Sequence, residues 1–201
     1  MKLGHRRLLL GMTLLLLLVV ASLLHPGVHW RVMGWWRGEG FYEGRPISYW
    51  REALLKFDDS IDGGALSKDR SHTFFERMAN TLGFDPGDSA EARKVMYHPA
   101  ATTVLLELLK DPDPHVRWLA VYSINRRFDP AKVVPGLSVI LRDEHLPNRR
   151  WAAHALAAFG PNAKEAVPIL LNALQEKDFF EWAADALKKI DPEAAANAGV
   201  K

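Results

Sequence analysis

The sequence contains no cysteine among its 201 residues. Disulfide bonds and thiolate metal sites are therefore excluded, and the redox compartment of the protein is left open. The sequence also lacks a basic excess in its main part. The net charge of +2 comes from Lys2, Arg6 and Arg7, because the first 24 residues contain no acid and the remainder has 23 basic and 24 acidic residues. A nucleic-acid-binding protein needs a basic surface, so no nucleic-acid partner is expected.

Charge is absent from a run of 17 residues, Leu8 to Leu24, that follows the basic start of the chain. As a helix this run would measure roughly 25 Å, the short end for a membrane span. It could instead be the apolar part of a cleaved signal peptide, although such parts are usually shorter. In both cases the basic N-terminus should stay inside the cell and the rest of the chain should cross the membrane. We favour an uncleaved anchor, since Trp prefers the membrane interface and the run is followed by Trp30, Trp35 and Trp36.

Aspartate and proline alternate at the start of one short segment, DPDPHVRWLAVYSI at 111–124. Asp113 can accept a backbone hydrogen bond at a helix start, and Pro114 suits the first helical position. A spacing of four, typical of one helix face, then relates Val116, Ala120 and Ile124. The preceding run at 104–111 also has helical spacing. The segment therefore predicts a helix, a tight turn and a second helix.

The same pattern recurs along the chain with a period of 31–33 residues. The first helices, TTVLLELLKD, VPGLSVILRD and VPILLNALQE, share two leucine positions and a final acid: Leu105, Leu137, Leu170, Leu109, Leu141, Leu174, Asp111, Asp143 and Glu176. The second helices share a large apolar position and then a small one: Leu119, Trp151, Trp182, Ala120, Ala152 and Ala183. The small residues should allow close helix contact, and the large ones should fill the layer between repeats. Stacked pairs of this kind share a core, and at least three are needed.

The D-x-x-V-R-x-x-A pattern of the first repeat resembles a HEAT repeat, at Asp113, Val116, Arg117 and Ala120. The V-P-x-L-L opening at 167–171 resembles one as well. The resemblance implies an all-α fold, a short armadillo-like α-solenoid whose second helices line the concave side. The second repeat has Asn148-Arg149 where Val-Arg is expected, and the third has Phe179-Phe180. These departures argue against a regular ladder of Asp and Arg between repeats.

The segment FYEGRPISYWREALLKF, 41–57, is similar to one that follows the anchor in bacterial membrane-anchored HEAT-repeat proteins. Pro46 should start a helix, whose apolar face would be made of Ile47, Trp50, Leu54 and Phe57. A second helix is expected over 70–84, and the two would cap the stack as a divergent repeat. The alanine-rich end after Ile190 should fray.

The expected organisation has five parts. They are a signal anchor or signal peptide at 1–24, a juxtamembrane linker at 25–45, the capping repeat at 46–97, three HEAT-like repeats at 98–194 and a C-terminal tail at 195–201.

Two groups of residues resemble metal ligands. Positions 1, 3, 5, 6 and 12 of a calcium-binding loop are matched by Asp58, Ser60, Asp62, Gly63 and Asp69. The alternative, which we favour, is a polar connector between helices, since Asp69 is shorter than the usual Glu. Among the eight histidines, His25 and His29 are four apart but have no third ligand nearby. We therefore expect no metal and no cofactor.

The second helices should expose a surface that crosses the repeats. If the shared alanines face the core, the exposed positions form three rows: Trp118, Arg150 and Glu181; Tyr122, His154 and Asp185; Arg126, Ala158 and Lys189. Aromatic residues and arginine are typical of protein-binding hot spots. The candidate partner-binding residues are therefore Trp118, Tyr122, Arg126, Arg150, His154 and Asp185, the first three stacked at intervals of four on one helix. The alternative is that Trp118 and Tyr122 pack against the preceding repeat as core.

His154 and Asp185 could also form a general base held by a carboxylate. No nucleophile accompanies them, and a G-x-S-x-G motif and a phosphate-binding glycine loop are absent from the sequence. We therefore expect no catalysis, and instead a membrane-tethered scaffold that binds another protein through its concave helices. It would be a single-pass protein of the bacterial cell membrane, with the solenoid on the extracytoplasmic side. The alternatives are a regulatory subunit or HEAT-like lyase-type enzyme, and a self-associating structural envelope protein.

Overall fold

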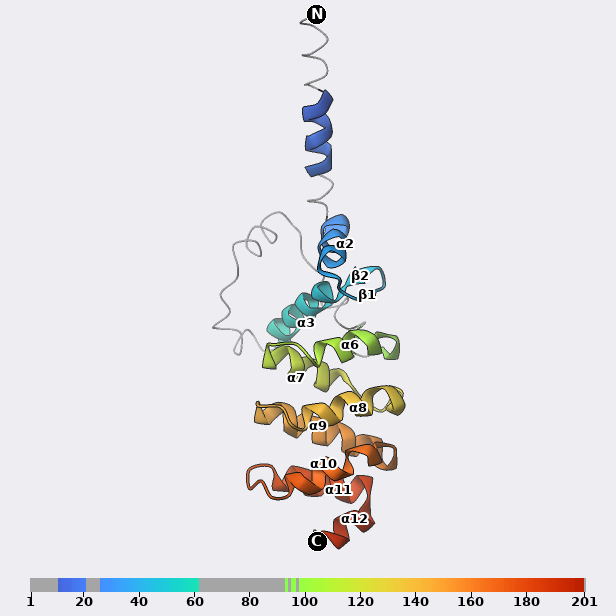
Figure 1. The fold of residues 1–201 in the computed structure, drawn as a ribbon, viewed down its shortest axis with the longest axis vertical. Coiled ribbons are helices and arrows are strands. Elements are labelled where there is room, and N and C mark those ends of the chain that lie inside the picture. Colours follow the sequence, from blue (N-terminus) through green and yellow to red (C-terminus); the bar gives the residue numbers. More distant parts are fainter. Residues whose placement is uncertain (1–10, 21–25, 62–92, 94, 97, 201) are drawn as a thin grey trace, which may run out of the picture.

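The helices stack one above another along the long axis of the molecule (Figure 1). This computed structural model describes residues 11–20, 26–61, 93, 95–96 and 98–200. The described residues are mostly helical, as the all-α expectation requires. The expected helix at 70–84 and most of the calcium-loop candidate at 58–69 lie outside the described ranges.

The apolar run at 8–24 is described only at 11–20, where the chain is helical and its large apolar side chains are exposed. None of the helices in the described ranges is both long enough and apolar enough to cross a membrane. The remainder of the run lies outside those ranges, so the expected anchor stays a prediction.

The segment expected to be a linker, 25–45, contains regular structure. Helix α2 (Pro26–Arg37) leads into a hairpin of strands β1 (Phe41–Tyr42) and β2 (Arg45–Pro46), which pair antiparallel. Both residues of the connecting turn, Glu43 (φ 49°) and Gly44 (φ 70°), have positive φ, as in the turns that match the twist of hairpin strands. Because α2 packs against β2 and α3 (Ile47–Ile61), this segment belongs to the fold and is more than the predicted linker.

Helix α3 closes the N-terminal end of the stack. It begins one residue after the predicted start at Pro46 and runs through 58–61, the first residues of the calcium-loop candidate. Trp50 and Leu54 are buried and Ile47 packs against the core, as expected of its apolar face. Since α3 contacts both α6 (Thr102–Leu108) and α7 (Pro114–Ser123), it covers apolar residues of the first repeat.

The three predicted repeats are three helix pairs: η1 (Pro99–Ala101) and α6 with α7; α8 (Pro130–Ile140) with α9 (Leu146–Phe159); η2 (Gly160–Ala166) and α10 (Val167–Ala173) with α11 (Phe180–Ile190). A last helix, α12 (Pro192–Asn197), packs against α11. The expectation that this end frays is wrong, because the Asp191 side chain accepts a hydrogen bond from the Ala194 N–H at 3.1 Å and Ala195 is buried.

Most of the shared repeat positions form the core. The buried members include the first leucine of each first helix and the shared alanine of each second helix: Leu105, Leu137, Leu170, Ala120, Ala152 and Ala183. The shared large apolar position differs from the expectation, since Leu119 is buried but Trp151 and Trp182 are exposed by 36% and 41%. An indole is too long to end inside the layer that a leucine fills, so it extends onto the surface.

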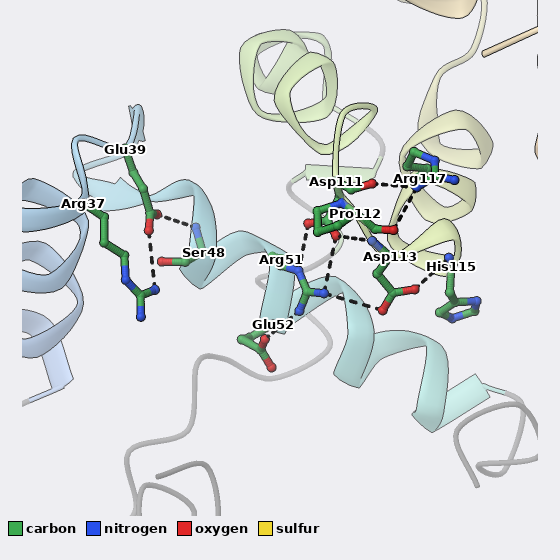
Figure 2. Close-up of polar contacts among 10 residues, drawn as sticks. All are labelled: Arg37, Glu39, Ser48, Arg51, Glu52, Asp111, Pro112, Asp113, His115 and Arg117. Carbon is green, nitrogen blue, oxygen red and sulfur yellow. Dashed lines mark hydrogen bonds and ion pairs between the residues drawn. The ribbon is translucent and has the colours of Figure 1, made fainter. Parts of the chain in front are cut away.

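An arginine from each of three helices reaches the turn of the next helix pair. In the described residues these ion pairs are Arg51–Asp111, Arg117–Asp143 and Arg149–Glu176. Figure 2 shows Arg51 of α3 between Asp111 and Asp113. The expectation that these ion pairs form no regular ladder is thus wrong from α3 to α9. In α9 only the valine of the Val-Arg pair is replaced, and Arg149 is kept. The ladder ends in α11, where Phe180 takes the place of the arginine. The position of Arg51 also places α3 as the equivalent of a second helix.

The departure at Asn148 has its own structural role. Asn148 is fully buried in α9, its Nδ2 donates to the carbonyl of Pro114 at 3.0 Å, and its Oδ1 lies 3.3 Å from Nδ1 of His145. A buried amide is costly unless it is hydrogen-bonded. Here its hydrogen bond ties α9 to the start of the preceding second helix.

Candidate protein-binding surface

Three aromatic rings pack together on the exposed side of α7 and α9. Trp118 and Tyr122 stack with ring centroids 5.4 Å apart and planes at 19°. Trp151, from the next repeat, meets both rings edge-on, with its centroid 5.3 Å from that of Tyr122 and 6.3 Å from that of Trp118. Stacked and edge-to-face rings at such distances are favoured arrangements. The three rings therefore form a preorganised surface across two repeats.

Histidines extend this surface at both ends. His115 stacks on Trp118 at 5.6 Å, and His154 meets Trp151 edge-on at 5.7 Å. We refer to His115, Trp118, Tyr122, Trp151 and His154 as the aromatic cluster. Tyr122 is 46% exposed, whereas Trp118 is partly buried against the core. Trp118 thus packs partly against the core, as in the alternative considered for it, whereas Tyr122 projects into solvent.

Local sequence explains why these rings face outward. Asp113 caps α7 as expected, accepting a hydrogen bond from the His115 N–H at 2.9 Å, and Pro114 takes the first helical position. The opposite face of α7 is buried through Val116 and Ala120. Because a helix places neighbouring side chains about 100° apart, fixing the apolar face inward leaves the aromatic face on the surface.

Arg126 lies outside the helical row predicted for it. Helix α7 ends at Ser123, and Asn125 then forms a turn in which its Oδ1 accepts a hydrogen bond from the Arg127 N–H at 3.0 Å and its Nδ2 donates to the Ser123 carbonyl at 3.2 Å. Asparagine readily makes such local turns. Arg126 is therefore an exposed turn residue next to α7, and the prediction of a three-residue row on one helix is wrong at its last member.

Arg150 lies beside a second feature, a hollow between α9 and the start of α11. Its Nη2 donates to the carbonyl of Asp178 at 3.3 Å, and its buried Nε has no hydrogen-bond partner among the described residues. Phe180, Glu181 and Trp182 also line the hollow. The guanidinium of Arg150 is thus directed to the next repeat.

His154 and Asp185 do not form the general-base pair considered from the sequence. Asp185 accepts a hydrogen bond from Lys189 of the same helix at 2.7 Å, and the ring of His154 contacts Trp151. Across the ranges the structure covers, no three His, Asp or Glu side chains are grouped so that they could hold a metal ion. Of the six candidates, Trp118, Tyr122 and His154 are therefore brought together by ring contacts. Arg150 and Asp185 instead bond to Asp178 and Lys189, and Arg126 is in the turn after α7.

Sequence reasoning missed His115 and Trp151 as surface residues. The repeat alignment places Trp151 in one register with Leu119, which is buried, and so predicts a core position for Trp151. A signal for its true place was available, since Trp151 is three residues before His154 and His115 three before Trp118, and such residues share a helix face.

Comparison with known proteins agrees with this architecture. The family model for HEAT repeats matches residues 102–188, which begin with α6 and end within α11. No curated protein and no solved structure matches the chain.

Proposed function

We propose that this protein is a membrane-tethered scaffold. Residues 102–188 match the family model for HEAT repeats, and such repeats generally mediate protein–protein interaction. The solenoid binds another protein through the exposed side of the second helices α7, α9 and α11. That side would be the concave one in the arrangement that the family resemblance implies. The role is recognition, without catalysis by the chain itself.

The aromatic cluster is the observation that carries this proposal. Exposed Trp and Tyr side chains dominate the energy of many protein interfaces, because they bury a large area and lose little side-chain entropy. Tyr122 and Trp151 are substantially exposed, yet their ring contacts already hold them in place. A partner would therefore find an ordered surface.

Charged side chains lie on the second helices or directly after one of them, and they suit the polar rim of an interface. Arg126 follows α7, and Asp185 lies on the exposed side of α11. Arg150 is half-buried at the hollow beside α11. With both signs of charge present, the partner should have a mixed polar rim around an apolar centre, as expected of one face of a helix or a short peptide.

Tethering is proposed from the apolar run at 8–24 and the basic residues that precede it. The basic residues set the orientation of the chain in the membrane. The positive N-terminus stays in the cytoplasm of a bacterial cell, and the solenoid lies on the outer side of the cell membrane. The partner would then be a membrane or envelope protein.

The test places negative charge on the exposed surface. We expect the double variant Tyr122→Glu/Arg126→Glu to lose a stoichiometric partner that wild type retains in affinity capture from gently solubilised membranes after brief cross-linking. Val139→Glu on α8 is the matched control, since Val139 is 70% exposed but lies on a first helix. Equal capture by wild type and the double variant would refute the proposed surface.

A further inference from the structure

Helix α2 has one face that is fixed to the fold. The ring of Trp30 packs edge-on against Tyr49 of α3 at 5.6 Å. One turn later Gly34 is buried, and a Cβ placed there would lie only 2.3 Å from the Cβ of Pro46. Trp30 and Gly34 therefore define the packed face of α2, and its orientation on the N-terminal end of the stack is set.

The opposite face of α2 is apolar and uncovered. Val32, Trp35 and Trp36 share one side of the helix, because they are spaced by three and four residues. Trp35 and Trp36 are 79% and 76% exposed, more than the other exposed tryptophans, Trp151 and Trp182. Exposure of two adjacent indoles to water is unfavourable in free energy. We therefore expect a membrane or a partner molecule to cover this face.

The chemistry around this face favours a lipid surface. Helix α2 contains no acid and has two arginines. Arg37 directly follows Trp36 and pairs with Glu39, and Arg31 donates to the carbonyl of Gly44. Tryptophan is the residue that most favours the membrane interface. The apolar run of the chain ends at Leu24, two residues before α2 begins at Pro26. A tethered chain would hold α2 at the membrane surface.

We infer that Trp35 and Trp36 insert into the membrane interface and lay α2 against the lipid headgroups. This inference rests on the proposed tether and adds a second membrane contact to it. Because α2 is fixed to α3 and the repeats stack beyond α3 (Figure 1), the contact would hold the solenoid at a defined angle to the bilayer. The aromatic cluster, on α7 and α9, would then face its partner at a fixed height.

Lipid quenching of tryptophan fluorescence tests the inference. The full chain would be reconstituted in vesicles of phosphatidylcholine and phosphatidylglycerol, with and without bromine atoms near the top of the acyl chains. We expect the lipid-quenchable emission to fall at least about twofold in Trp35→Phe/Trp36→Phe, since these two rings would supply most of the interfacial signal. The control Trp182→Phe, an exposed ring on α11, should leave the quenching by lipid unchanged.

Vesicle flotation, measured on the same samples, separates the inference from the tether. Flotation of the full chain, together with the expected fall in lipid-quenchable emission in the double variant, supports both the inference and the tether. Flotation with equal quenching in wild type and double variant overturns the inference and leaves the tether in place. Failure of the full chain to float overturns both. A further outcome is that wild type floats, shows no quenching through Trp35 and Trp36, and cross-links to itself through position 35. A second copy of the chain would then cover the exposed face of α2, and the inference would be wrong.

Discussion

Arg117 of α7 and Asp143, in the turn between α8 and α9, form a two-point ion pair between neighbouring repeats. Their Nε–Oδ2 and Nη2–Oδ1 distances are 2.6 and 3.0 Å, and their side chains are only 11% and 4% exposed. The third nitrogen, Nη1, donates to the carbonyls of Asp111 and Pro112 (Figure 2). One guanidinium thus joins the turn of its own repeat to that of the next.

Removal of this ion pair should be costly. We expect Asp143→Ala to lower the free energy of unfolding by about 3 kcal/mol, because it leaves the buried guanidinium of Arg117 without its carboxylate. The equivalent change in the next ion pair, Glu176→Ala, should cost less than about 1 kcal/mol, since the Glu176 side chain is 50% exposed and exposed ion pairs contribute little. Urea unfolding followed by circular dichroism measures both values. Equal losses would show that burial of the pair does not matter.

The same carboxylate should make stability depend on pH. Burial opposes ionisation of Asp143, but hydrogen bonds from Arg117, the His145 N–H and Asn148, together with the charge of Arg117, outweigh it and lower its pKa. Its contribution to stability is therefore complete above the unfolded pKa of about 3.9 and is lost as pH falls through the lower folded pKa. Below about pH 4, wild type should lose stability more steeply than Asp143→Asn. Parallel pH profiles would contradict this assignment.

Gly34 should be irreplaceable by a larger residue for steric reasons. In Gly34→Val the side chain would collide with Pro46, so α2 should move off the hairpin and expose Trp30, at a cost of roughly 1–3 kcal/mol. Hydrogen exchange of α2 amides would report the detachment. Gly40→Ala is the control, because a Cβ there makes an ordinary contact of 3.7 Å with Ile47. Slow exchange retained in Gly34→Val would disprove the docking of α2 through this face.

The two exposed tryptophans of the second helices should differ in their effect on partner binding. Trp151→Ala breaks the aromatic cluster and should weaken capture of the partner about tenfold or more, the scale of an interface hot spot. Trp182→Ala, of similar exposure but without a ring contact to Trp151 in the described residues, should change it far less. Quantitative capture over a dilution series compares them. A larger loss for Trp182→Ala would move the binding surface to the hollow beside α11.

The repeat pattern allowed the solenoid to be predicted from the sequence because apolar spacing alone determines which face of each helix is buried. Leu105, Leu137 and Leu170 needed no other information. The positions that failed depend on tertiary context. The place of Trp151 follows from the length of its ring relative to Leu119, and that of Arg126 from a turn made by Asn125.

The N-terminal end was the least predictable part of the described chain. Helix α2 has a narrow packed face, made by Trp30 and Gly34, and a glycine inside a helix weakens any pattern-based assignment. The hairpin strands contain two residues each, too few to show an alternating pattern. These elements are stabilised by contacts with one another and with α3 and α6, and such contacts cannot be read from local sequence.

The measurement that tests the central claim most directly is photo-cross-linking in living cells, with a photoreactive phenylalanine analogue at position 122 or, as the control, at position 139. If the exposed side of the second helices binds a partner, position 122 should yield one defined cross-linked protein and position 139 on α8 should not. Equal cross-linking from both positions, or none from position 122, would contradict the claim that this protein is a scaffold acting through its aromatic cluster.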